Sequence, residues 1–330
     1  MRAWVLEQSP GAYELADVAI GPPGPGQVQV NVMASALNHI DLWLAEGQPR
    51  PRRLPMVGGS DGAGTVSAVG PGVSRWRPGD EVVVNPSFAC GRCEECLADR
   101  SVFCSQWGVM GEHYWGAHAA GVLVGEANLV AKPTGTSWEE AGAYGLCGLT
   151  AYRLLRRARL QSGEVLLVVG AGGGVAAAAL TLGARWGARV FATSRDARKR
   201  ARAIELGAED AFPTGEGAPL KADVVVDSSG AATWRTSLAA LRPGGRLVIC
   251  GGTAGAKVEL ALPQLFYRHL EVMGSTMGTF REFEELTNLV ATGLPVVVDS
   301  AFSFEDYPAA LAKLGAGEQF GKVVLVGPRA

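Results

Sequence analysis

The stretch VLLVVGAGGGVAAAALTLGARW, residues 165–186, decides how the chain is interpreted. Its first five residues form a short apolar run typical of a strand buried on both faces. A glycine-rich turn follows at 170–174, and the Ala- and Leu-rich residues 175–186 predict a buried helix. The uncharged run 165–184 is long enough to span a bilayer, but the glycines interrupt it. Strand, turn and helix is therefore the better interpretation.

This turn has the position of a dinucleotide-binding loop, because a strand, a glycine turn and a helix together bind a pyrophosphate. The strict pattern G-x-G-x-x-G fails, since Val175 occupies its last position, whereas the looser Gly170-x-x-Gly173-x-x-Ala176 fits. A glycine-rich helix start without a ligand is the alternative. The residues predicted to contact the cofactor here are Gly170, Gly172, Gly173, Gly174 and Val175.

The end of the next strand, expected at 189–193, favours NADPH over NADH. An acidic residue at this position usually binds the ribose 2′-hydroxyl of NAD, and the strand end has none. A serine beside several cations suits a 2′-phosphate instead. The alternative is a solvated helix face, which we expect for Arg200 and Arg202 in any case. The residues predicted to hold the 2′-phosphate are Ser194, Arg195 and Lys199.

Outside this segment, the pattern of apolar runs and turns changes at about residue 145. Before it, Val-rich runs alternate with Gly/Pro turns and predict a compact β-barrel; they are 27–32, 64–69, 81–84 and 121–124. After it, strands alternate with helices, which implies a parallel sheet with right-handed crossovers; the runs are 165–169, 189–193, 222–226 and 246–250. A last strand at 321–326 rejoins the first domain. The predicted domains are 1–145, 146–276 and a returning segment, 277–330.

Composition and charge exclude several classes of protein. A chain of 330 residues suggests about two domains, and 48% hydrophobic with 19% charged residues fits a folded protein with a large core. The net charge of −2 gives no field for steering toward nucleic acid or an anionic membrane. No apolar signal core follows Met1, so we expect a cytoplasmic protein whose six cysteines are reduced.

Four of these cysteines lie in a lobe at about 88–106. The spacing Cys90-x-x-Cys93-x-x-Cys96, then seven residues and Cys104, is typical of a metal site. Four thiolates close a tetrahedral zinc shell and leave no position for substrate, so the zinc would be structural. An iron–sulfur cluster is the alternative, but it favours a shorter gap followed by proline, and here Ser105 follows. We predict one structural zinc per chain.

The glycine turn, the four-cysteine lobe and the terminal strand 321–324 together resemble the medium-chain dehydrogenase/reductase superfamily, which includes zinc alcohol dehydrogenases and quinone oxidoreductases. The resemblance covers essentially the whole chain. It implies a GroES-like catalytic domain, a Rossmann domain, and a cleft between them where nicotinamide meets substrate. It also implies that Lys322 reaches the pyrophosphate, that Gly252 and Ser275 line the nicotinamide, and that the protein is a homodimer or homotetramer.

The chain departs from this family at the catalytic zinc. By resemblance, the three ligand positions hold Asn38, Ser60 and Leu146, which are poor ligands beside thiolate and imidazole. Cys147 misses the third position by one residue, about 100° around a helix. The pair Asn38-x-x-Asp41 is similar to the zinc-free quinone oxidoreductases. An unusual metal site is the alternative, with candidates His39, His113, Asp41, Asp61 and Cys147, whereas His118 is expected to pack or cap a loop.

Without a Lewis acid, alcohol oxidation loses its means of lowering the pKa of the hydroxyl. We therefore predict an NADPH-dependent reductase of a quinone or an α,β-unsaturated carbonyl. Asn38 and Ser60 would donate hydrogen bonds to the developing oxyanion, and the proton would come from His39 or, equally, from water. Asp41 is a catalytic candidate whose alternative role is to hold a loop or helix start. The alternative functions are a zinc alcohol or aldehyde dehydrogenase with rearranged ligands, and a non-catalytic dinucleotide-binding protein.

Overall fold

The computed structural model describes residues 1–216 and 219–327, and the chain divides into two compact units. Unit 1 comprises Met1–Leu146 and Gly278–Ala330, and unit 2 comprises Cys147–Met277. Each boundary lies one residue from the position expected from the sequence. Helix α4 (Gly145–Arg157) contains the first boundary.

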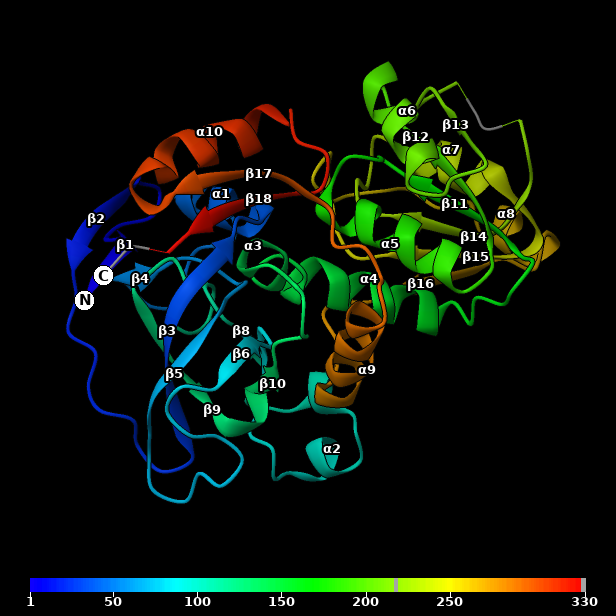
Figure 1. Ribbon diagram of the computed structural model, residues 1–330. Helices are drawn as coiled ribbons and strands as arrows, with labels where there is room; N and C mark the ends of the chain where they lie inside the picture. Colours follow the sequence, from blue (N-terminus) through cyan, green and yellow to red (C-terminus); the bar gives the residue numbers. More distant parts are fainter. Residues whose placement is uncertain (217–218, 328–330) are drawn as a thin grey trace. The chain divides into compact units, whose positions relative to one another are not determined.

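Unit 1 is built on a seven-stranded sheet with the order β10–β6–β5–β3–β18–β17, in which β9 also pairs with β3 (Figure 1). Its strands are β3 (Gln27–Ala36), β5 (Ala63–Val69), β6 (Glu81–Val84), β9 (Gly121–Gly125), β10 (Leu129–Ala131), β17 (Val298–Ser303) and β18 (Lys322–Val326). Val28, Val30 and Val32 of β3 alternate inward, as the period of two along a strand requires. The last strand of the chain, β18, pairs antiparallel with the end of β3.

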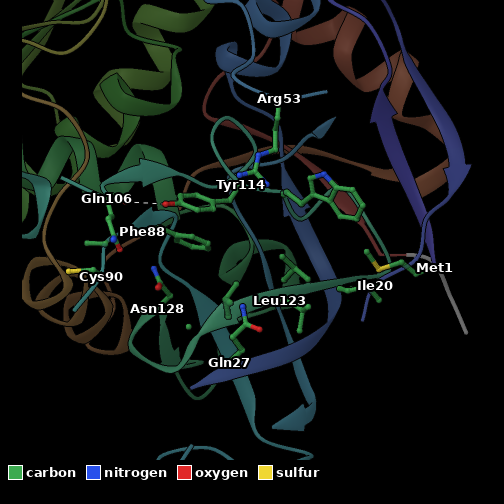
Figure 2. Close-up of a pocket in the computed structure, with 17 residues that line it drawn as sticks. Met1, Ile20, Gln27, Arg53, Phe88, Cys90, Gln106, Tyr114, Leu123 and Asn128 are labelled. Atoms are coloured by element: carbon green, nitrogen blue, oxygen red, sulfur yellow. Dashed lines mark hydrogen bonds between the residues drawn. The ribbon is translucent and has the colours of Figure 1, made fainter. Parts of the chain in front are cut away.

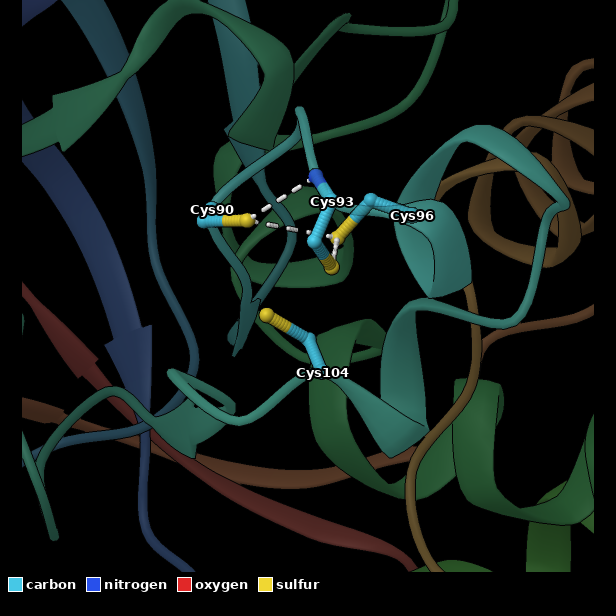
Figure 3. Close-up of side chains that lie close together, drawn as sticks. All are labelled: Cys90, Cys93, Cys96 and Cys104. Carbon is cyan, nitrogen blue, oxygen red and sulfur yellow. Dashed lines mark hydrogen bonds between the residues drawn. The ribbon is translucent and has the colours of Figure 1, made fainter.

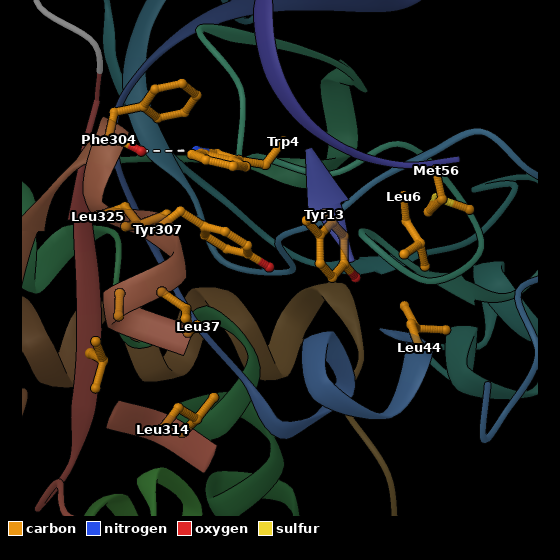
Figure 4. Packing of buried hydrophobic residues seen from close by; sticks show 12 residues of the cluster. Trp4, Leu6, Tyr13, Leu37, Leu44, Met56, Phe304, Tyr307, Leu314 and Leu325 are labelled. Carbon is orange, nitrogen blue, oxygen red and sulfur yellow. Dashed lines mark hydrogen bonds between the residues drawn. The ribbon is translucent and has the colours of Figure 1, made fainter. Parts of the chain in front are cut away.

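Smaller elements complete unit 1. They are the sheet β2 (Tyr13–Asp17)–β1 (Arg2–Leu6)–β4 (Met56–Val57), the pair β7 (Ser87–Phe88) and β8 (Gly108–Val109), and helices α1 (His39–Glu46), α2 (Glu94–Leu97), α3 (Trp138–Ala141), α9 (Phe280–Ala291) and α10 (Tyr307–Ala316). A buried cluster joins the N-terminal strands to α10 (Figure 4). Within it the Tyr307 ring stacks on Trp4 with centroids 4.9 Å apart and meets Tyr13 edge-on at 5.4 Å. Such pairs add to the apolar area that the rings bury.

Unit 2 is a parallel sheet with the strand order β13–β12–β11–β14–β15–β16, the doubly wound order of a Rossmann fold. Its strands are β11 (Val165–Val169), β12 (Arg189–Thr193), β13 (Asp210–Phe212), β14 (Ala222–Asp227), β15 (Leu241–Ile249) and β16 (Glu271–Gly274). Its helices besides α4 are α5 (Gly174–Arg185), α6 (Ala197–Glu205), α7 (Trp234–Ala240) and α8 (Leu262–Tyr267). The fold class predicted from the sequence, a GroES-like domain with a Rossmann domain, is confirmed.

The segment that raised the question of a membrane span folds as β11, a glycine turn and α5. Strand β11 is central in the sheet, and four of its five residues are buried, as expected for a parallel strand covered on both faces. Across residues 1–216 and 219–327, none of the helices combines the length and apolarity needed to cross a bilayer.

Candidate functional site

The four cysteines of the lobe converge around one point in unit 1 (Figure 3). Their sulfur atoms all lie within 4.8 Å of one another, with Cys90–Cys96 at 3.9 Å and Cys93–Cys96 at 3.5 Å. A tetrahedral zinc with Zn–S bonds of about 2.3 Å requires sulfur separations of roughly 3.8 Å. The four thiols therefore fit a closed structural zinc site.

Two of the four cysteines of the lobe differ in the pKa of their thiols. The N–H groups of Arg92 and Cys93 lower the pKa of the Cys90 thiol to about 6. Burial and the neighbouring cysteines raise the pKa of the Cys96 thiol to about 12. The backbone therefore favours the thiolate form at Cys90 and not throughout the lobe.

The glycine turn of unit 2 is shaped for an anion. Gly172 has φ +123°, and a Cβ there would lie 2.7 Å from Lys199 Cδ and 3.2 Å from Lys199 Nζ. Helix α5 begins after Gly173 without a capping side chain, so its first N–H groups can bind a phosphate. The Lys199 side chain lies against the turn, so Gly172 and Lys199, which are both predicted cofactor contacts, are neighbours.

Near the end of β12, the structure differs from the expectation at one residue, Arg200 of helix α6. Ser194 is buried and Arg195 is exposed, both directly after Thr193. Arg200 is not part of a solvated face, since its guanidinium donates to the Ser194 carbonyl oxygen at 2.8 Å and to that of Arg195 at 3.3 Å. That expectation was wrong because a long side chain reaches back one turn to the carbonyls at the strand end. Arg202 is exposed and pairs with Glu205 at 2.6 Å, as expected.

The two predicted nicotinamide contacts lie in loops that follow β15 and β16. Gly252 packs closely against Gly255 and Ala256. The Ser275 hydroxyl is buried and has no hydrogen-bond partner among the described residues. A buried hydroxyl without a partner is costly, so Ser275 fits a ligand contact. Both assignments stay predictions.

A buried ionic network forms the centre of the candidate site in unit 1. The Lys322 ammonium lies 2.9 Å from Asp61 Oδ2 and donates to Asn38 Oδ1 at 2.5 Å and to the Leu37 carbonyl oxygen at 2.8 Å. The Asn38 amide donates to Asp61 Oδ2 at 3.0 Å and to the Ala36 carbonyl oxygen at 3.2 Å. Both amide hydrogens of Asn38 thus have acceptors within unit 1, so donation to a substrate would require one of these bonds to be exchanged.

Ser60 is in a different situation from Asn38. It is fully buried, and its hydroxyl has no hydrogen-bond partner among the residues described. A buried donor in this state carries a desolvation cost that a ligand oxygen would remove. Of the two residues, Ser60 is the one whose side chain has an unsatisfied hydrogen-bonding group, and its contact with substrate stays a prediction.

Asp41 fixes the two loops that carry these residues. Its carboxylate accepts the Asn38 N–H at 2.8 Å, as the capping box of α1, and the Gly59 N–H at 3.1 Å. Gly59 has φ +97°, and a Cβ there would approach the His118 nitrogen to 2.5 Å. The structure thus gives Asp41 the holding role, and a catalytic role for it stays a prediction.

His118 is buried beside Asp41, with Nε2 3.5 Å from Oδ2, and its Nδ1 lies 3.0 Å from Ser35 Oγ. Burial alone raises the pKa of Asp41, but His118 and the two N–H donors outweigh it and hold that pKa below the usual value. Ser35, His118 and Asp41 are linked in the same order as the members of a nucleophilic triad. Their side chains contact one another, and Asp41 also accepts two backbone N–H groups, so we assign all three to packing and positioning.

His39 begins α1 next to this network. Burial and the charge of Lys322 lower the pKa of its imidazole, while Asp41 acts in the opposite direction. The imidazole is consequently neutral at pH 7. A role as proton source then requires activity to increase as the pH falls.

A catalytic zinc does not fit the residues at its usual positions. They offer an amide, a hydroxyl and an aliphatic side chain, and the Lys322 ammonium lies among them. Within the described part of the chain, the four-cysteine lobe is the only cluster of three or more His, Cys, Asp or Glu side chains able to hold a metal. The rearranged metal site considered from the sequence is not assembled there: the His113 imidazole, for example, accepts the Val109 N–H at 3.2 Å.

A cavity of about 420 Å³ opens elsewhere in unit 1 (Figure 2). Phe88, Tyr114 and Leu123 line it together with Cys90. The Tyr114 hydroxyl donates to the Gln106 carbonyl oxygen at 3.0 Å. None of the predicted catalytic residues lines this cavity, so it is separate from the candidate site.

Sequence reasoning missed the pairing of Lys322 with Asn38 and Asp61. Lys322 and Asn38 are 284 residues apart, and no local pattern connects them. The available signal was the acidic residue Asp61, for which the neighbouring sequence offers no basic partner. The link between Asp41 and His118 was missed for the same reason.

Comparisons with known proteins agree with this architecture. The alcohol dehydrogenase GroES-like domain family matches residues 24–134, and the zinc-binding dehydrogenase family matches residues 174–292. The zinc-type alcohol dehydrogenase-like protein YogA of Leptosphaeria maculans is 30% identical, over 92% of this chain and 91% of its own length.

Two solved structures are similar over nearly the whole chain. A crystal structure of an NAD-dependent alcohol dehydrogenase is 39% identical, covers 99% of both chains and superposes with a TM-score of 0.94. The crotonyl-CoA carboxylase/reductase AntE in complex with NADP is 27% identical, over 99% of this chain and 94% of its own, with a TM-score of 0.92. The fold and its two domains define an NAD(P)H-dependent oxidoreductase acting on small molecules. The chain belongs to the medium-chain dehydrogenase/reductase superfamily, as the sequence resemblance predicted.

Proposed function

We propose that this enzyme uses NADPH to reduce an α,β-unsaturated carbonyl compound, with quinones as a second acceptor class, and that hydride transfer needs no metal ion. The observation that carries the proposal is the donor set at positions 38, 60 and 146, where an amide, a hydroxyl and a leucine replace metal ligands. A conjugated alkene accepts hydride at carbon and develops negative charge on its carbonyl oxygen. A positioned hydrogen-bond donor can stabilise that charge.

The residues of unit 1 then have distinct tasks. Bound NADPH supplies the hydride, and the acceptor also gains one proton. The unpartnered Ser60 hydroxyl donates to the carbonyl oxygen, while Asn38 and Asp41 keep the neighbouring loops in place. The proton comes from solvent or through His39, so the rate would increase as the pH decreases toward the lowered pKa of that imidazole.

The preference for NADPH rests on the basic groups around the glycine turn. Lys199 lies against Gly172, and Ser194 stands at the end of β12 without an acidic residue beside it on that strand. We expect Lys199→Met to raise the KM for NADPH by roughly 10- to 100-fold, the value of a lost charged hydrogen bond, with little change for NADH. Arg202→Met on the same helix is the matched control. A clear preference of the wild type for NADH would contradict the cofactor proposal.

The function is tested by steady-state kinetics with a panel of enones, 2-enoyl-CoA thioesters, quinones and primary alcohols. We expect enone or enoyl thioester reduction with NADPH to dominate, and we expect one zinc per chain by elemental analysis. The 39% identity to an NAD-dependent alcohol dehydrogenase favours a second candidate, alcohol oxidation with NAD. Alcohol turnover with two zinc ions per chain would replace the first proposal by the second. NADPH binding without turnover of any acceptor would support a non-catalytic protein.

A homodimer or homotetramer is part of the same proposal. Strand β16 pairs only with β15 in the described sheet, which leaves one of its edges open. The adjacent helix α8 exposes Leu262, Phe266 and Tyr267. An open edge beside exposed apolar side chains is a favourable surface for self-association. Light scattering coupled to size-exclusion chromatography gives the mass, and a monomer would contradict this part.

A further inference from the structure

The cavity of about 420 Å³ in unit 1 owes its shape to one face of β9. Gly121, Leu123 and Gly125 share that face, because side chains alternate along a strand. Val122 and Val124 point the other way and are buried in the core. A glycine on each side of Leu123 leaves space above the strand, and all three residues of this face line the cavity.

The space above Gly125 is open to a ligand. Its φ of −70° is in the range of any residue, and a Cβ there would meet nothing closer than Asn128 Oδ1 at 3.4 Å. Asn128 is buried in the wall of the cavity. Its amide N–H groups donate to the carbonyl oxygens of Asn85 and Ser87, at 3.0 and 3.2 Å. The side-chain oxygen of Asn128 is therefore left as an acceptor beside Gly125.

Aromatic rings form another part of the wall (Figure 2). Phe88 and Tyr114 are neighbours, with ring centroids 5.1 Å apart. Trp115 also lines the cavity, and its indole N–H donates to the Pro55 carbonyl oxygen at 3.1 Å. The Tyr114 hydroxyl is likewise bound to a backbone carbonyl oxygen, so these rings offer apolar surface. A cavity of this volume with a largely apolar wall is typical of a small-molecule site.

One charged side chain lies at this wall. Among the described residues that line the cavity, Arg53 carries the only permanent charge. The charge of its neighbour Arg52 acts on Glu112 and His113, whereas no carboxylate in the described ranges forms an ion pair with Arg53. A guanidinium binds a planar carboxylate through two parallel N–H donors. An unpaired guanidinium beside aromatic rings is complementary to an aromatic carboxylate.

We propose that this cavity is a second ligand site, separate from the candidate active site, and that it binds small aromatic carboxylates. The carboxylate pairs with Arg53, and the ring packs against Phe88, Tyr114 and Leu123. Asn128 Oδ1 accepts a hydrogen bond from an N–H or O–H group that the ligand carries. None of these side chains takes part in hydride transfer, so the inference does not rest on the proposed function.

The experiment measures binding of 2-naphthoate, and of its uncharged analogue 2-naphthamide, to the full-length zinc-loaded protein by isothermal titration calorimetry. We expect 2-naphthoate to bind saturably. Arg53→Met should raise its Kd by roughly 10- to 100-fold, the value of lost hydrogen bonds to a charged group, and leave the Kd of 2-naphthamide nearly unchanged. Arg50→Met is the matched control, because Arg50 belongs to the same segment but does not line the cavity.

A second variant tests the location of the site. Gly125→Leu fills the cavity and should abolish binding of both compounds, whereas Gly21→Leu, at an exposed glycine outside the cavity, should not. If Gly125→Leu does not fold, Leu123→Trp fills the same space. Absence of saturable 2-naphthoate binding at millimolar concentration would overturn the proposal, as would binding that survives the filling variant. Equal weakening of the acid and the amide in Arg53→Met would overturn the assignment of a carboxylate.

Discussion

The cysteine lobe and the Lys322 centre both concentrate charge within unit 1, but they balance it in opposite ways. In the lobe, four thiols lie within 4.8 Å of one another, and the charge of their thiolates is balanced by a cation from outside. At the other centre, Asp61 is balanced by Lys322, a cation carried by the chain itself. The difference teaches that charge balance belongs to the individual site: the lobe requires a cation from outside the chain, whereas the carboxylate of Asp61 is paired with a side chain of the same chain.

The largest effect is expected in the lobe. Cys104→Ser removes one of four thiolates, and the free energy of zinc binding, about 10 kcal/mol or more in small zinc domains, is also folding free energy. We expect zinc to fall from one per chain to none, with a lower unfolding temperature. Elemental analysis and thermal denaturation measure both. Cys147→Ser is the control and keeps its zinc; a fully loaded Cys104→Ser protein would remove the contrast between the two centres.

A smaller but still large effect is expected beside the pair of Asp61 and Lys322. Asp41→Asn removes the carboxylate that accepts the N–H groups of Asn38 and Gly59. Hydrogen bonds to a charged group contribute roughly 1.5–3 kcal/mol each, so we expect a loss of about that size or more. Urea denaturation measures the loss in unfolding free energy. The control is Asp99→Asn, which removes one partner of the exposed pair with Arg281 and should cost about 1 kcal/mol or less. Equal losses in the two variants would show that Asp41 does not hold the loops.

The difference in unfolding free energy between wild type and Asp41→Asn should also depend on pH. The folded pKa of Asp41 lies below its usual value, so the unfolded chain takes up the proton first as the pH falls. The stabilisation by Asp41 is complete above the usual pKa and is lost as the pH falls through the folded pKa. The gap in unfolding free energy between wild type and Asp41→Asn should therefore close in acid. A gap that widened with falling pH would contradict this assignment.

The smallest effect is expected where the lobe meets α9. Arg281 lies 3.4 Å from Asp99, and both side chains are exposed. Exposed pairs contribute about 1 kcal/mol or less and weaken with salt. Arg281→Ala should keep its zinc and shift the denaturation midpoint only slightly. A loss of zinc in this variant would mean that the lobe depends on α9 as well as on its metal.

The sequence predicted features that neighbouring residues determine. Strands β11 and β12 lie at the predicted residues, because buried parallel strands form continuous apolar runs. The four cysteines converge because three of them repeat every third residue. The start of β15 was placed five residues too late, since Leu241 pairs with Ala222 across a register shift that no local pattern reveals.

The ionic centre could not be predicted in the same way. Its members come from the end of β3, from the loop before β5 and from β18, and tertiary pairing brings them together. Arg200 shows the same limit on a smaller scale, because helix periodicity gives the face of a residue but not the reach of its side chain. A pattern along the chain predicts neighbours in sequence, whereas this site is made of neighbours in space.

The position of β18 has a consequence for the order in which the chain becomes native during synthesis. Unit 2 lies within one uninterrupted segment, Cys147–Met277, so all of its strands are synthesised before Gly278 is added. Unit 1 begins before unit 2 but is completed after it, because Lys322 and the strand beside β3 follow residue 277 in the chain. Domains fold as units as they are synthesised. The nascent chain is thus able to form unit 2 while Asp61 still lacks its cation, which arrives only with β18.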